Sequence, residues 1–416
     1  MRVEPPQDTR GALHGLRVLD LSRVLAGPWA AQVLGDLGAE VIKVEPPDRG
    51  DDTRGWGPPF LHGADGPSDA AYFLCTNRNK RCIAIDFAQP EGAALVRQLA
   101  AQSDILLENF KTGGLAKYGL DYASLAALNP RLIYCSVTGF GHTGPYASRP
   151  GYDFLIQGMS GLMSITGRRD GEPGAGPMKV GLAVSDLFTG LYASTAILAA
   201  LQHRNATGEG QHIDIALLDS QVAVLVNQAM NYLVGGMVPT RLGNAHPNVV
   251  PYRDFTAADG EVLVACGNDG QFRALCRLLD RADLAADPAY ADNAGRLRNR
   301  VALEAALGET IAGWRSAELF AAMTAAGVPG GPVNRIDQVL HDPQIEARGM
   351  LRTMRRGDGT EVRVIGYPAQ LSRSPATYRI APQEHGQETA QVLAERLGTD
   401  AETFARLRAS GVVGGR

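Results

Sequence analysis

In the first part of the chain, short apolar runs typical of strands alternate with longer segments typical of helices. Runs of strand length occupy residues 17–21, 40–45, 83–86, 105–108 and 131–137. Between such runs, residues 28–37 and 91–101 are predicted to form helices, with Pro28 suited to a first helical turn and Gly38 to the position after a helix. Short apolar strands separated by helices predict a parallel sheet covered on both faces, the α/β arrangement of a Rossmann-like domain.

The pattern changes in the middle of the chain. Strand-like runs at residues 252–255 and 261–266 are followed by predicted helices. This change predicts a second, smaller α+β domain at residues 227–332. Its last segment, residues 327–332, is rich in glycine and proline and is predicted to be a linker.

The last part of the chain is predicted to return to the large domain. A strand-like run at residues 362–365 and a helix at 387–397 lead to this prediction, so that residues 1–226 and 333–416 would form one domain together. Residues 1–11 are polar, contain two prolines and lack an apolar segment. We expect a short disordered lead there rather than a signal peptide.

Composition narrows the class of protein. The 416 residues are 45% hydrophobic and 20% charged, which fits a soluble globular protein of two to three domains. Forty Lys and Arg residues against 44 Asp and Glu residues give a net charge of -4 without a long basic run, so neither nucleic acid nor a membrane is an expected partner. The most apolar helical segment, Leu187–Leu201, is predicted to be too short and too interrupted to span a bilayer.

The cysteines indicate the compartment. Their number, five, is odd, and the sequence contains neither a C-x-x-C pair nor a dense disulfide framework. We therefore expect reduced thiols in a cytoplasmic protein, and no zinc site.

One carboxylate interrupts the most apolar stretch of the chain. Asp186 lies where a predicted helix begins, directly before Leu187–Leu201. The positive end of a helix stabilises an anion by about 0.3–1 kcal/mol, so an ionised and nucleophilic Asp186 is expected there. The alternative is that Asp186 or Ser185 is only the N-cap of the helix, which the local pattern favours when taken alone.

Two patterns typical of dinucleotide sites lack their structural context. Residues 139–144 match G-x-G-x-x-G after a strand, but Pro145 and Pro150 interrupt any long helix that would follow. The turn at residues 22–27 lacks the glycine fingerprint, although Glu45 ends the second strand as in dinucleotide folds. An NAD-dependent dehydrogenase is therefore the weaker enzyme hypothesis.

Several further motifs occur in order along the chain. They are Arg23–Pro28, Leu34–Glu45, Asn77–Arg81, Glu108–Phe110, Gly151–Asp153, Ser160–Met163 and the Asp186 segment. Together they make nearly the whole chain resemble the class III CoA-transferase family, which includes formyl-CoA transferases and carnitine-CoA transferases. Three more motifs, Gly50–Arg54, Val249–Tyr252 and Gly327–Pro329, resemble the branch of succinyl-CoA:dicarboxylate CoA-transferases.

The resemblance implies an activity and a nucleophile. Family members move CoA between two carboxylic acids through an aspartyl intermediate, and Asp186 matches the position of the nucleophile. We therefore expect transfer of CoA from a donor such as succinyl-CoA to a small, glutarate-like dicarboxylate, with CoA as a substrate rather than a tightly bound cofactor. The resemblance also implies ring-shaped subunits that interlock as a homodimer.

The expected CoA contacts likewise come from the resemblance. It implies that CoA is bound by Leu25, Ala26, Ile85, Asp86, Phe87, Ala88, Asn109, Phe110, Lys111 and Lys117. Tyr152 and Asp153 match positions that line the active site in transferases. Without the resemblance, Ile85 and Phe87 would be assigned to strand packing, Lys117 to a solvated helix face, and Tyr152 equally well to a buried hydroxyl bonded to backbone.

Three positions depart from patterns of the family. Acyl-CoA racemases of the same superfamily carry a histidine base where this chain has Tyr152, and a phenol ordinarily titrates near about 10. Tyr152 therefore argues against racemisation. An acyl-CoA racemase is kept as an alternative hypothesis, as is a non-catalytic CoA-binding protein. Lys117 replaces a common arginine and can still meet a phosphate as a point charge. Gly243–Asn248 corresponds to a mobile glycine-rich loop of relatives but contains one glycine, which leaves closure of that loop open.

A dicarboxylate acceptor requires a cation for its distal carboxylate. An arginine fork matches a carboxylate with two hydrogen bonds. The candidates are Arg23, Arg54, Arg149, His142 and His246. The sequence alone does not choose among them.

Overall fold

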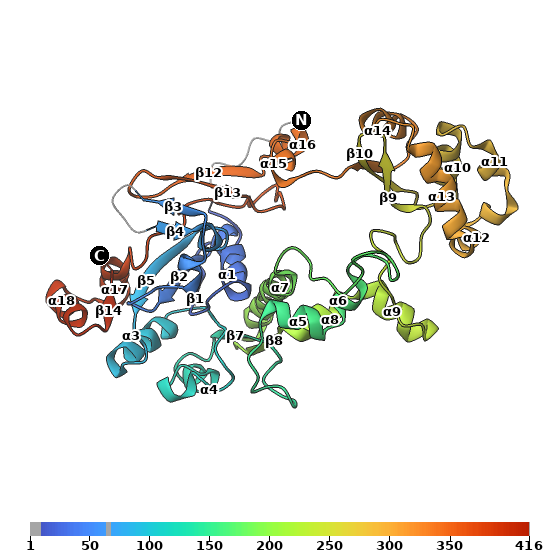
Figure 1. Ribbon diagram of the computed structural model, residues 1–416. Helices are drawn as coiled ribbons and strands as arrows, with labels where there is room; N and C mark the ends of the chain where they lie inside the picture. The colour runs from blue at the N-terminus through green and yellow to red at the C-terminus, as the bar shows by residue number, and fades with distance from the viewer. Residues whose placement is uncertain (1–9, 64–67, 416) are drawn as a thin grey trace. The chain divides into compact units, whose positions relative to one another are not determined.

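The computed structural model describes residues 10–63 and 68–415, so the predicted disordered lead at residues 1–11 lies almost entirely outside the described residues. The chain divides into two compact units (Figure 1). The first comprises Met1–Gly161, Val180–Val224 and Pro343–Arg416, and the second comprises Leu162–Lys179 and Leu225–Asp342. Residues 227–332, predicted as the smaller domain, lie in the second unit, which also includes the segment just before the Asp186 helix.

A seven-stranded sheet forms the centre of the first unit, with the strand order β14-β5-β2-β1-β6-β7-β8. Its strands are β1 (Arg17–Asp20), β2 (Glu40–Glu45), β5 (Lys80–Ile85), β6 (Ile105–Glu108), β7 (Ile133–Thr138), β8 (His212–Ala216) and β14 (Val413–Gly414). Every neighbouring pair is parallel except β14 and β5, which are antiparallel. The predicted α/β class with a mostly parallel sheet is confirmed.

Helices cover both faces of this sheet. The covering helices are α1 (Ala26–Asp36), α3 (Pro90–Ala101), α4 (Tyr122–Leu128), α7 (Val184–Thr207), α17 (Thr389–Leu397) and α18 (Ala401–Ala409). Along β6, Leu106 packs into the core with α3 and α17, whereas Ile105 and Leu107 pack into the core with α1 and α7. Because alternate residues of a strand point to opposite faces, both sides of each central strand are apolar, as the continuous hydrophobic runs predict.

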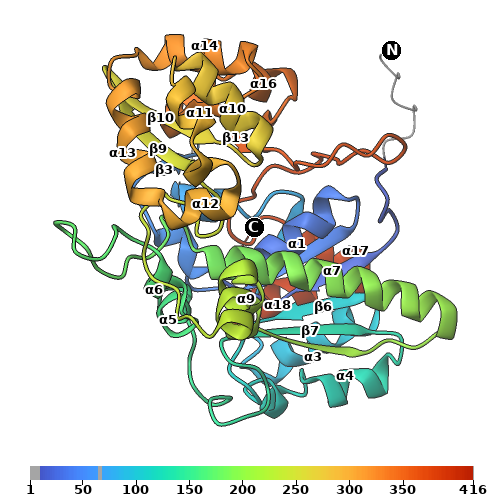
Figure 2. The ribbon, with the colours of Figure 1, turned by 90° about the vertical axis from the view of Figure 1, so that its right-hand side faces the viewer.

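Helix α7 is longer than the sequence predicts. It has 24 residues and, among the described helices, is the one that is long and apolar enough to cross a membrane by length and composition. The prediction that it is too short is therefore wrong. One side of α7 packs against α1 and the sheet through Ala193 and Ile197. Figure 2 shows α7 running beside α1 and across the sheet. Its other side exposes Phe188, Leu191 and Tyr192.

The second unit contains a three-stranded antiparallel sheet of order β11-β10-β9. The strands are β9 (Tyr252–Ala257), β10 (Gly260–Ala265) and β11 (Gly330–Pro332), and the helices are α6 (Leu162–Ile165), α9 (Val226–Gly235), α10 (Asp269–Leu278), α11 (Ala282–Ala286), α12 (Asn293–Arg298), α13 (Arg300–Ile311), α14 (Ser316–Ala325) and α15 (Ile336–Val339). Phe255, Val262, Phe272 and Leu307 belong to its buried core. This unit therefore has a core of its own.

The predicted linker at residues 327–332 is wrong, because its last residues form β11. A Cβ atom on Gly330 would lie 2.5 Å from Met323 Cε and 2.6 Å from the Leu263 carbonyl oxygen. Glycine is thus required for close packing rather than for flexibility. Strand β11 is at the edge of the sheet, where Pro332 is tolerated despite its missing N–H.

The remaining elements belong to the first unit. They are β3 (Phe60–His62), β4 (Ser68–Ala70), α2 (Ala71–Leu74), α5 (Asp153–Met159), α8 (Leu217–Ala223), α16 (Pro343–Ala347), β12 (Leu351–Arg355) and β13 (Glu361–Ile365). Strands β12 and β13 form an antiparallel pair. The chain then reaches α17, so the C-terminal part returns to the first unit.

Candidate active site

The sheet order reverses at β1, which pairs with β2 on one side and with β6 on the other. Ligands of open α/β sheets bind at such a point, beyond the carboxyl ends of the strands. A cavity of about 190 Å³ lies there. Its walls are residues 23–26 after β1, 109–112 after β6, 137–139 at the end of β7, 147–152, Asp52, Asp186 and Leu217. The structure thus brings together seven predicted residues: Leu25, Ala26, Asn109, Phe110, Lys111, Tyr152 and Asp186.

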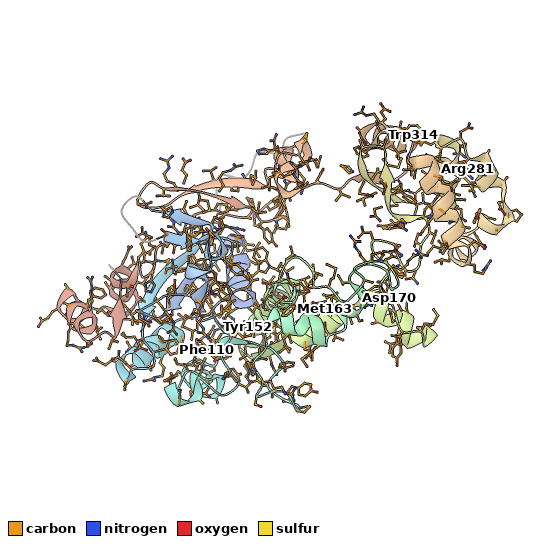
Figure 3. All side chains as sticks on the ribbon, in the orientation of Figure 1. Phe110, Tyr152, Met163, Asp170, Arg281 and Trp314 are labelled. Carbon is orange, nitrogen blue, oxygen red and sulfur yellow. The ribbon has the colours of Figure 1, made fainter. Side chains whose placement is uncertain are left out.

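A second cavity of about 480 Å³ holds the other group of predicted CoA contacts. Ile85, Asp86, Phe87 and Ala88 line it, together with Leu21, Arg23, Val44, Pro46, Pro47, Asp48, Arg49, Phe110 and Gly411. Arg23 and Phe110 line both cavities. The shared residues make the two cavities neighbours, so an elongated ligand could occupy both. Figure 3 labels Phe110 and Tyr152, which mark this part of the first unit.

The aromatic wall between the cavities extends toward Lys117. Phe87 packs edge to face against Phe110 and Tyr118, with ring centroids 5.6 and 5.7 Å apart. Lys117 is exposed and lines neither cavity, but its Nζ lies 4.7 Å from the Tyr118 ring centroid. Contact between Lys117 and CoA therefore stays a prediction.

Side chains from neighbouring strands hold the loop after β1. The Asn109 side chain accepts the N–H of Arg23 at 2.9 Å and donates to its carbonyl oxygen at 2.7 Å. Lys43 Nζ donates to the Ser22 carbonyl oxygen at 2.8 Å, and the Asp51 carboxylate accepts the N–H of Val24 at 3.3 Å. Val24 has φ of 71°, a left-handed conformation that strains a β-branched residue. The loop that lines the cavity is therefore held in place by fixed partners.

The charges behind this loop are compensated. Lys43 Nζ lies 2.9 Å from Asp51 Oδ2, and both side chains are completely buried. Burial alone would raise the pKa of Asp51, but Lys43 and the hydrogen bonds from Thr53 outweigh it and lower the pKa to about 2. The pKa of Lys43 is raised, because Asp51 and Asp20 outweigh its burial. This pair therefore stays ionised.

Asp186 occupies the first turn of α7 but does not cap it. The N-cap is Ala183, and no side chain caps the helix. Ser185 instead donates its hydroxyl to Gln221 Oε1 at 2.8 Å. The alternative that Asp186 or Ser185 is only a cap is therefore wrong.

The protonation of Asp186 also differs from the prediction. Burial, and then the negative charge of Asp153, raise its pKa to about 7. These effects outweigh the stabilisation of about 0.3–1 kcal/mol that a helix end provides. The expectation that the helix end sets the protonation of Asp186 is therefore wrong, because burial and Asp153 bring its pKa to about 7.

Asp153 is fixed beside the nucleophile segment. It is the first residue of α5, its Oδ1 accepts the N–H of Ser185 at 2.8 Å, and its Oδ2 accepts Gln157 Nε2 at 2.7 Å. Within the described residues, no hydrogen bond ends on the Asp186 carboxylate. One carboxylate is thus held by donors, and its neighbour is left available for reaction.

Tyr72 is a neighbour of Asp186 that sequence reasoning missed. Burial, and then the charges of Asp186, Cys75 and Asp153, raise the pKa of its phenol to about 12. The ring packs edge to face against Trp56 at 5.2 Å. Tyr72 remains a hydrogen-bond donor at neutral pH. No spacing in the sequence points to it, because it reaches Asp186 only through the fold.

Tyr152 is placed at the surface of the cavity rather than in the core. Its exposed fraction is 67%, so the alternative of a buried tyrosine bonded to backbone is wrong. It precedes α5 as the N-cap residue. Its ring is therefore accessible from the cavity, and its neighbour Asp153 acts on Asp186.

The first glycine of the G-x-G-x-x-G pattern, Gly139, has a packing explanation. A Cβ atom on Gly139 would lie 2.5 Å from the Cα atom of Gly151, so two backbone segments cross at these glycines. Residues 139–152 form turns without a helix, and α5 begins at Asp153. The crossing brings Tyr152 to the end of β7. A dinucleotide site is not needed to account for Gly139.

The segment Gly243–Asn248 is fastened inside the second unit. Gly243 donates its N–H to the Gly167 carbonyl oxygen at 3.2 Å, and Asn244 donates to Asp254 at 2.8 Å. The His246 carbonyl oxygen accepts Arg300 Nη2 at 2.7 Å. Closure of this loop over an intermediate stays a prediction.

Known proteins agree with this architecture over nearly the whole chain. The sequence model of CoA-transferase family III matches residues 13–389. The succinate–glutarate CoA-transferase of Agrobacterium fabrum is 53% identical over 384 residues, covering 92% of this chain and 95% of that protein. The human succinyl-CoA:glutarate CoA-transferase is 41% identical, covering 96% of this chain and 90% of that protein.

A solved structure shows the same relation. The crystal structure of a CaiB/BaiF family protein from Brucella suis matches with a TM-score of 0.82 and 50% identity, covering 93% of this chain and all of that one. The family match and these identities extend across both units and include the cavity described above. The protein therefore belongs to CoA-transferase family III and is a CoA-transferase that uses CoA thioesters as substrates.

Proposed function

We propose that the protein transfers CoA between succinyl-CoA and glutarate, with Asp186 as the nucleophile. The observation that supports this proposal most directly is the position of Asp186 in a cavity joined, through Arg23 and Phe110, to a second cavity suited to the rest of CoA. The Agrobacterium and human relatives carry the names of transferases for this donor and acceptor.

The reaction would begin when the ionised Asp186 attacks the thioester carbonyl of succinyl-CoA. The C–S bond breaks, giving a mixed anhydride of Asp186 and succinate, together with CoA thiolate. The thiolate then attacks the aspartyl carbonyl, which releases succinate and leaves an aspartyl thioester. Glutarate attacks that thioester and forms a second anhydride, from which CoA thiolate takes the glutaryl group and regenerates Asp186.

The surroundings of Asp186 suit these steps. A pKa of about 7 keeps a useful fraction of the carboxylate ionised while leaving it more basic than an ordinary aspartate. Each tetrahedral oxyanion needs a donor, and the protonated Tyr72 phenol and backbone amides of residues 23–26 are the nearby candidates. The fixed loop would keep those amides in position during both halves of the reaction.

A trapping experiment tests the nucleophile. Enzyme incubated with succinyl-CoA and then treated with hydroxylamine should gain a hydroxamate at Asp186, visible by peptide mass spectrometry. Asp186→Ala should give no adduct and no glutaryl-CoA. Full transfer by Asp186→Ala, or an adduct on another residue, would overturn the assignment.

We also propose that the protein works as an interlocked homodimer in the cytoplasm. Apolar side chains support an interface, because α9 exposes Leu233 and Val234 by 71% and 80%, and α7 exposes Leu191 and Tyr192. The five cysteines are free thiols, as expected in a reducing compartment. Light scattering should give twice the mass of 44.2 kDa; the mass of one chain would contradict the dimer.

A further inference from the structure

Three cations share the cavity with Asp186, and their surroundings differ. Arg23, Lys111 and Arg149 line it, together with Asp52 and Asp186. The proposed reaction presents a distal carboxylate twice, because both the succinyl and the glutaryl group carry one. One cation placed near Asp186 could serve both groups.

Three of the five candidate cations for the distal carboxylate can be set aside. Arg54 is buried, and it donates to Glu45 and Asp69 through three bonds of 2.7 Å, so its guanidinium is already occupied by carboxylates. Neither His142 nor His246 belongs to the described residues that line the cavity. Arg23 and Arg149 remain.

Arg23 lies where the two cavities meet. Its guanidinium lies 5.0 Å from the Phe110 ring centroid and its Nη1 lies 3.6 Å from Asp52 Oδ2. Because Arg23 lines both cavities, it lies on the route between them, whereas Lys111, which follows Phe110 in the chain, lines the Asp186 cavity only. A cation on that route is suited to the phosphates of a long ligand rather than to its acyl end. Lys111 carries a point charge and lacks the planar fork that binds a carboxylate with two hydrogen bonds.

Arg149 lies just before α5, the helix whose first residue is hydrogen-bonded next to Asp186. Four residues later, Asp153 accepts the N–H of Ser185, the residue directly before Asp186. Arg149 lines the Asp186 cavity but not the second one. Its guanidinium lies 4.0 Å from the Tyr146 ring centroid, and within the described residues it forms no ion pair. Its fork is therefore available to a carboxylate.

We propose that Arg149 binds the distal carboxylate of the acyl group and makes the enzyme select dicarboxylic acids over monocarboxylic acids of the same length. This assignment rests on the proposed transfer to glutarate. The reacting carboxyl group meets Asp186, and the other carboxylate accepts two parallel hydrogen bonds from the guanidinium. A monocarboxylic acid presents a methyl group to Arg149 instead and gains nothing from its charge.

The test compares glutarate with valerate, which has the same carbon chain and one carboxylate. For Arg149→Gln, the ratio of kcat/KM for glutarate to that for valerate should fall about tenfold or more, the usual worth of a charged hydrogen-bonded pair. Arg149→Lys should fall between Gln and wild type, because it keeps the charge and loses the fork. Arg273→Gln, an exposed change on α10 with the same loss of charge, should keep the wild-type ratio.

Binding of free CoA separates the two possible roles of Arg149. Calorimetry should give Arg149→Gln the wild-type Kd for CoA, because CoA lacks the distal carboxylate. A weakened Kd with an unchanged acid ratio would make Arg149 a CoA contact and overturn the proposal. If the wild-type enzyme forms no glutaryl-CoA from succinyl-CoA and glutarate, the proposed function fails. If it forms glutaryl-CoA but uses valerate equally well, or if both Arg149 variants keep the wild-type preference, the Arg149 assignment alone is overturned.

Discussion

Asp51 and Asp186 are two carboxylates of the first unit, both largely withdrawn from water, with opposite electrostatics. Asp51 accepts hydrogen bonds from Lys43 and Thr53, which outweigh burial and lower its pKa to about 2. At Asp186, burial and the charge of Asp153 act in the same direction and raise the pKa to about 7. The negative charge of Asp51, which holds the loop after β1, is thus balanced by a cation. The negative charge of Asp186, the proposed nucleophile, has no such cation.

The difference shows how one fold uses buried carboxylates in two ways. A compensated carboxylate is a structural anchor, whose ionised form is stabilised by the folded state. A buried carboxylate without a cation makes the folded state less stable when it ionises. The same electrostatic cost raises its pKa and makes the carboxylate more basic and more nucleophilic. Substitutions at the two sites should therefore separate stability from activity.

The largest effect is expected for Asp186→Asn. The amide has nearly the same shape but cannot form the anhydride, so glutaryl-CoA formation should fall by about 10³-fold or more. Steady-state assays with succinyl-CoA and glutarate measure this loss. An Asn variant that retains more than about a tenth of the wild-type rate would contradict the role of Asp186, provided that deamidation to Asp is excluded by mass.

The same variant should be more stable than the wild type at high pH. Because the folded pKa of Asp186 is raised to about 7, the folded protein holds a proton that the unfolded chain has lost, and stability falls as pH rises from about 4 to about 7. Asn has no proton to lose, so its gain in unfolding free energy, up to about 4 kcal/mol, should appear at pH 8 and vanish near pH 4. Thermal melts at both pH values measure it.

Lys43→Met should mainly lower the free energy of unfolding, whereas Asp186→Asn mainly lowers activity. It leaves the Asp51 carboxylate buried without its cation, which typically costs about 3–5 kcal/mol. Urea unfolding measures the change, and adding Asp51→Asn should restore part of it by removing the unpaired charge. A loss below about 1 kcal/mol for Lys43→Met would show that the pair is not the anchor inferred from its burial.

Asp153→Asn should have a smaller effect, on the pH dependence of the rate. Removing the negative charge lowers the pKa of Asp186, so the rise of kcat/KM with pH should move to lower pH by about one unit. The Asn oxygen can still accept the N–H of Ser185. An unchanged profile would show that burial alone sets the pKa of Asp186. The control Asp219→Asn removes an exposed carboxylate that does not contribute to the raised pKa of Asp186, so it should leave the profile in place.

Sequence patterns predicted the sheet of the first unit well, because its strands are apolar on both faces and its helices are punctuated by residues such as Pro28 and Gly38. They failed at residues 327–332, since glycine and proline are equally typical of a linker and of an edge strand. Only the positions of Met323 and Leu263 show that Gly330 is required for packing.

The site could be predicted only in part. The structure gathers Leu25, Asn109 and Asp186, which the resemblance implied, around one cavity, and their roles in binding and catalysis stay predictions. The raised pKa of Asp186 could not be predicted from the sequence, because it depends on burial and on Asp153. Asp153 lies 33 residues earlier in the chain, and folding brings it near Asp186. Tyr72 was missed for the same reason: its distance to Asp186 is a property of the fold.

The smallest effect is expected for Val24→Gly. This variant tests whether the rigidity of the loop after β1, which Asp51 holds, contributes to substrate binding in the cavity. Glycine removes the left-handed strain of Val24 but adds freedom to the unfolded chain, so unfolding free energy should change by no more than about 1 kcal/mol. A loop that is less fixed should lose about 1 kcal/mol of pre-organisation, or roughly fivefold in the KM for succinyl-CoA. Val24→Ala keeps the Cβ atom and much of the restriction, so its KM should stay closer to that of the wild type. If Gly and Ala give the same KM, the hydrogen bonds from Asp51, Asn109 and Lys43 fix the loop without help from the side chain at position 24.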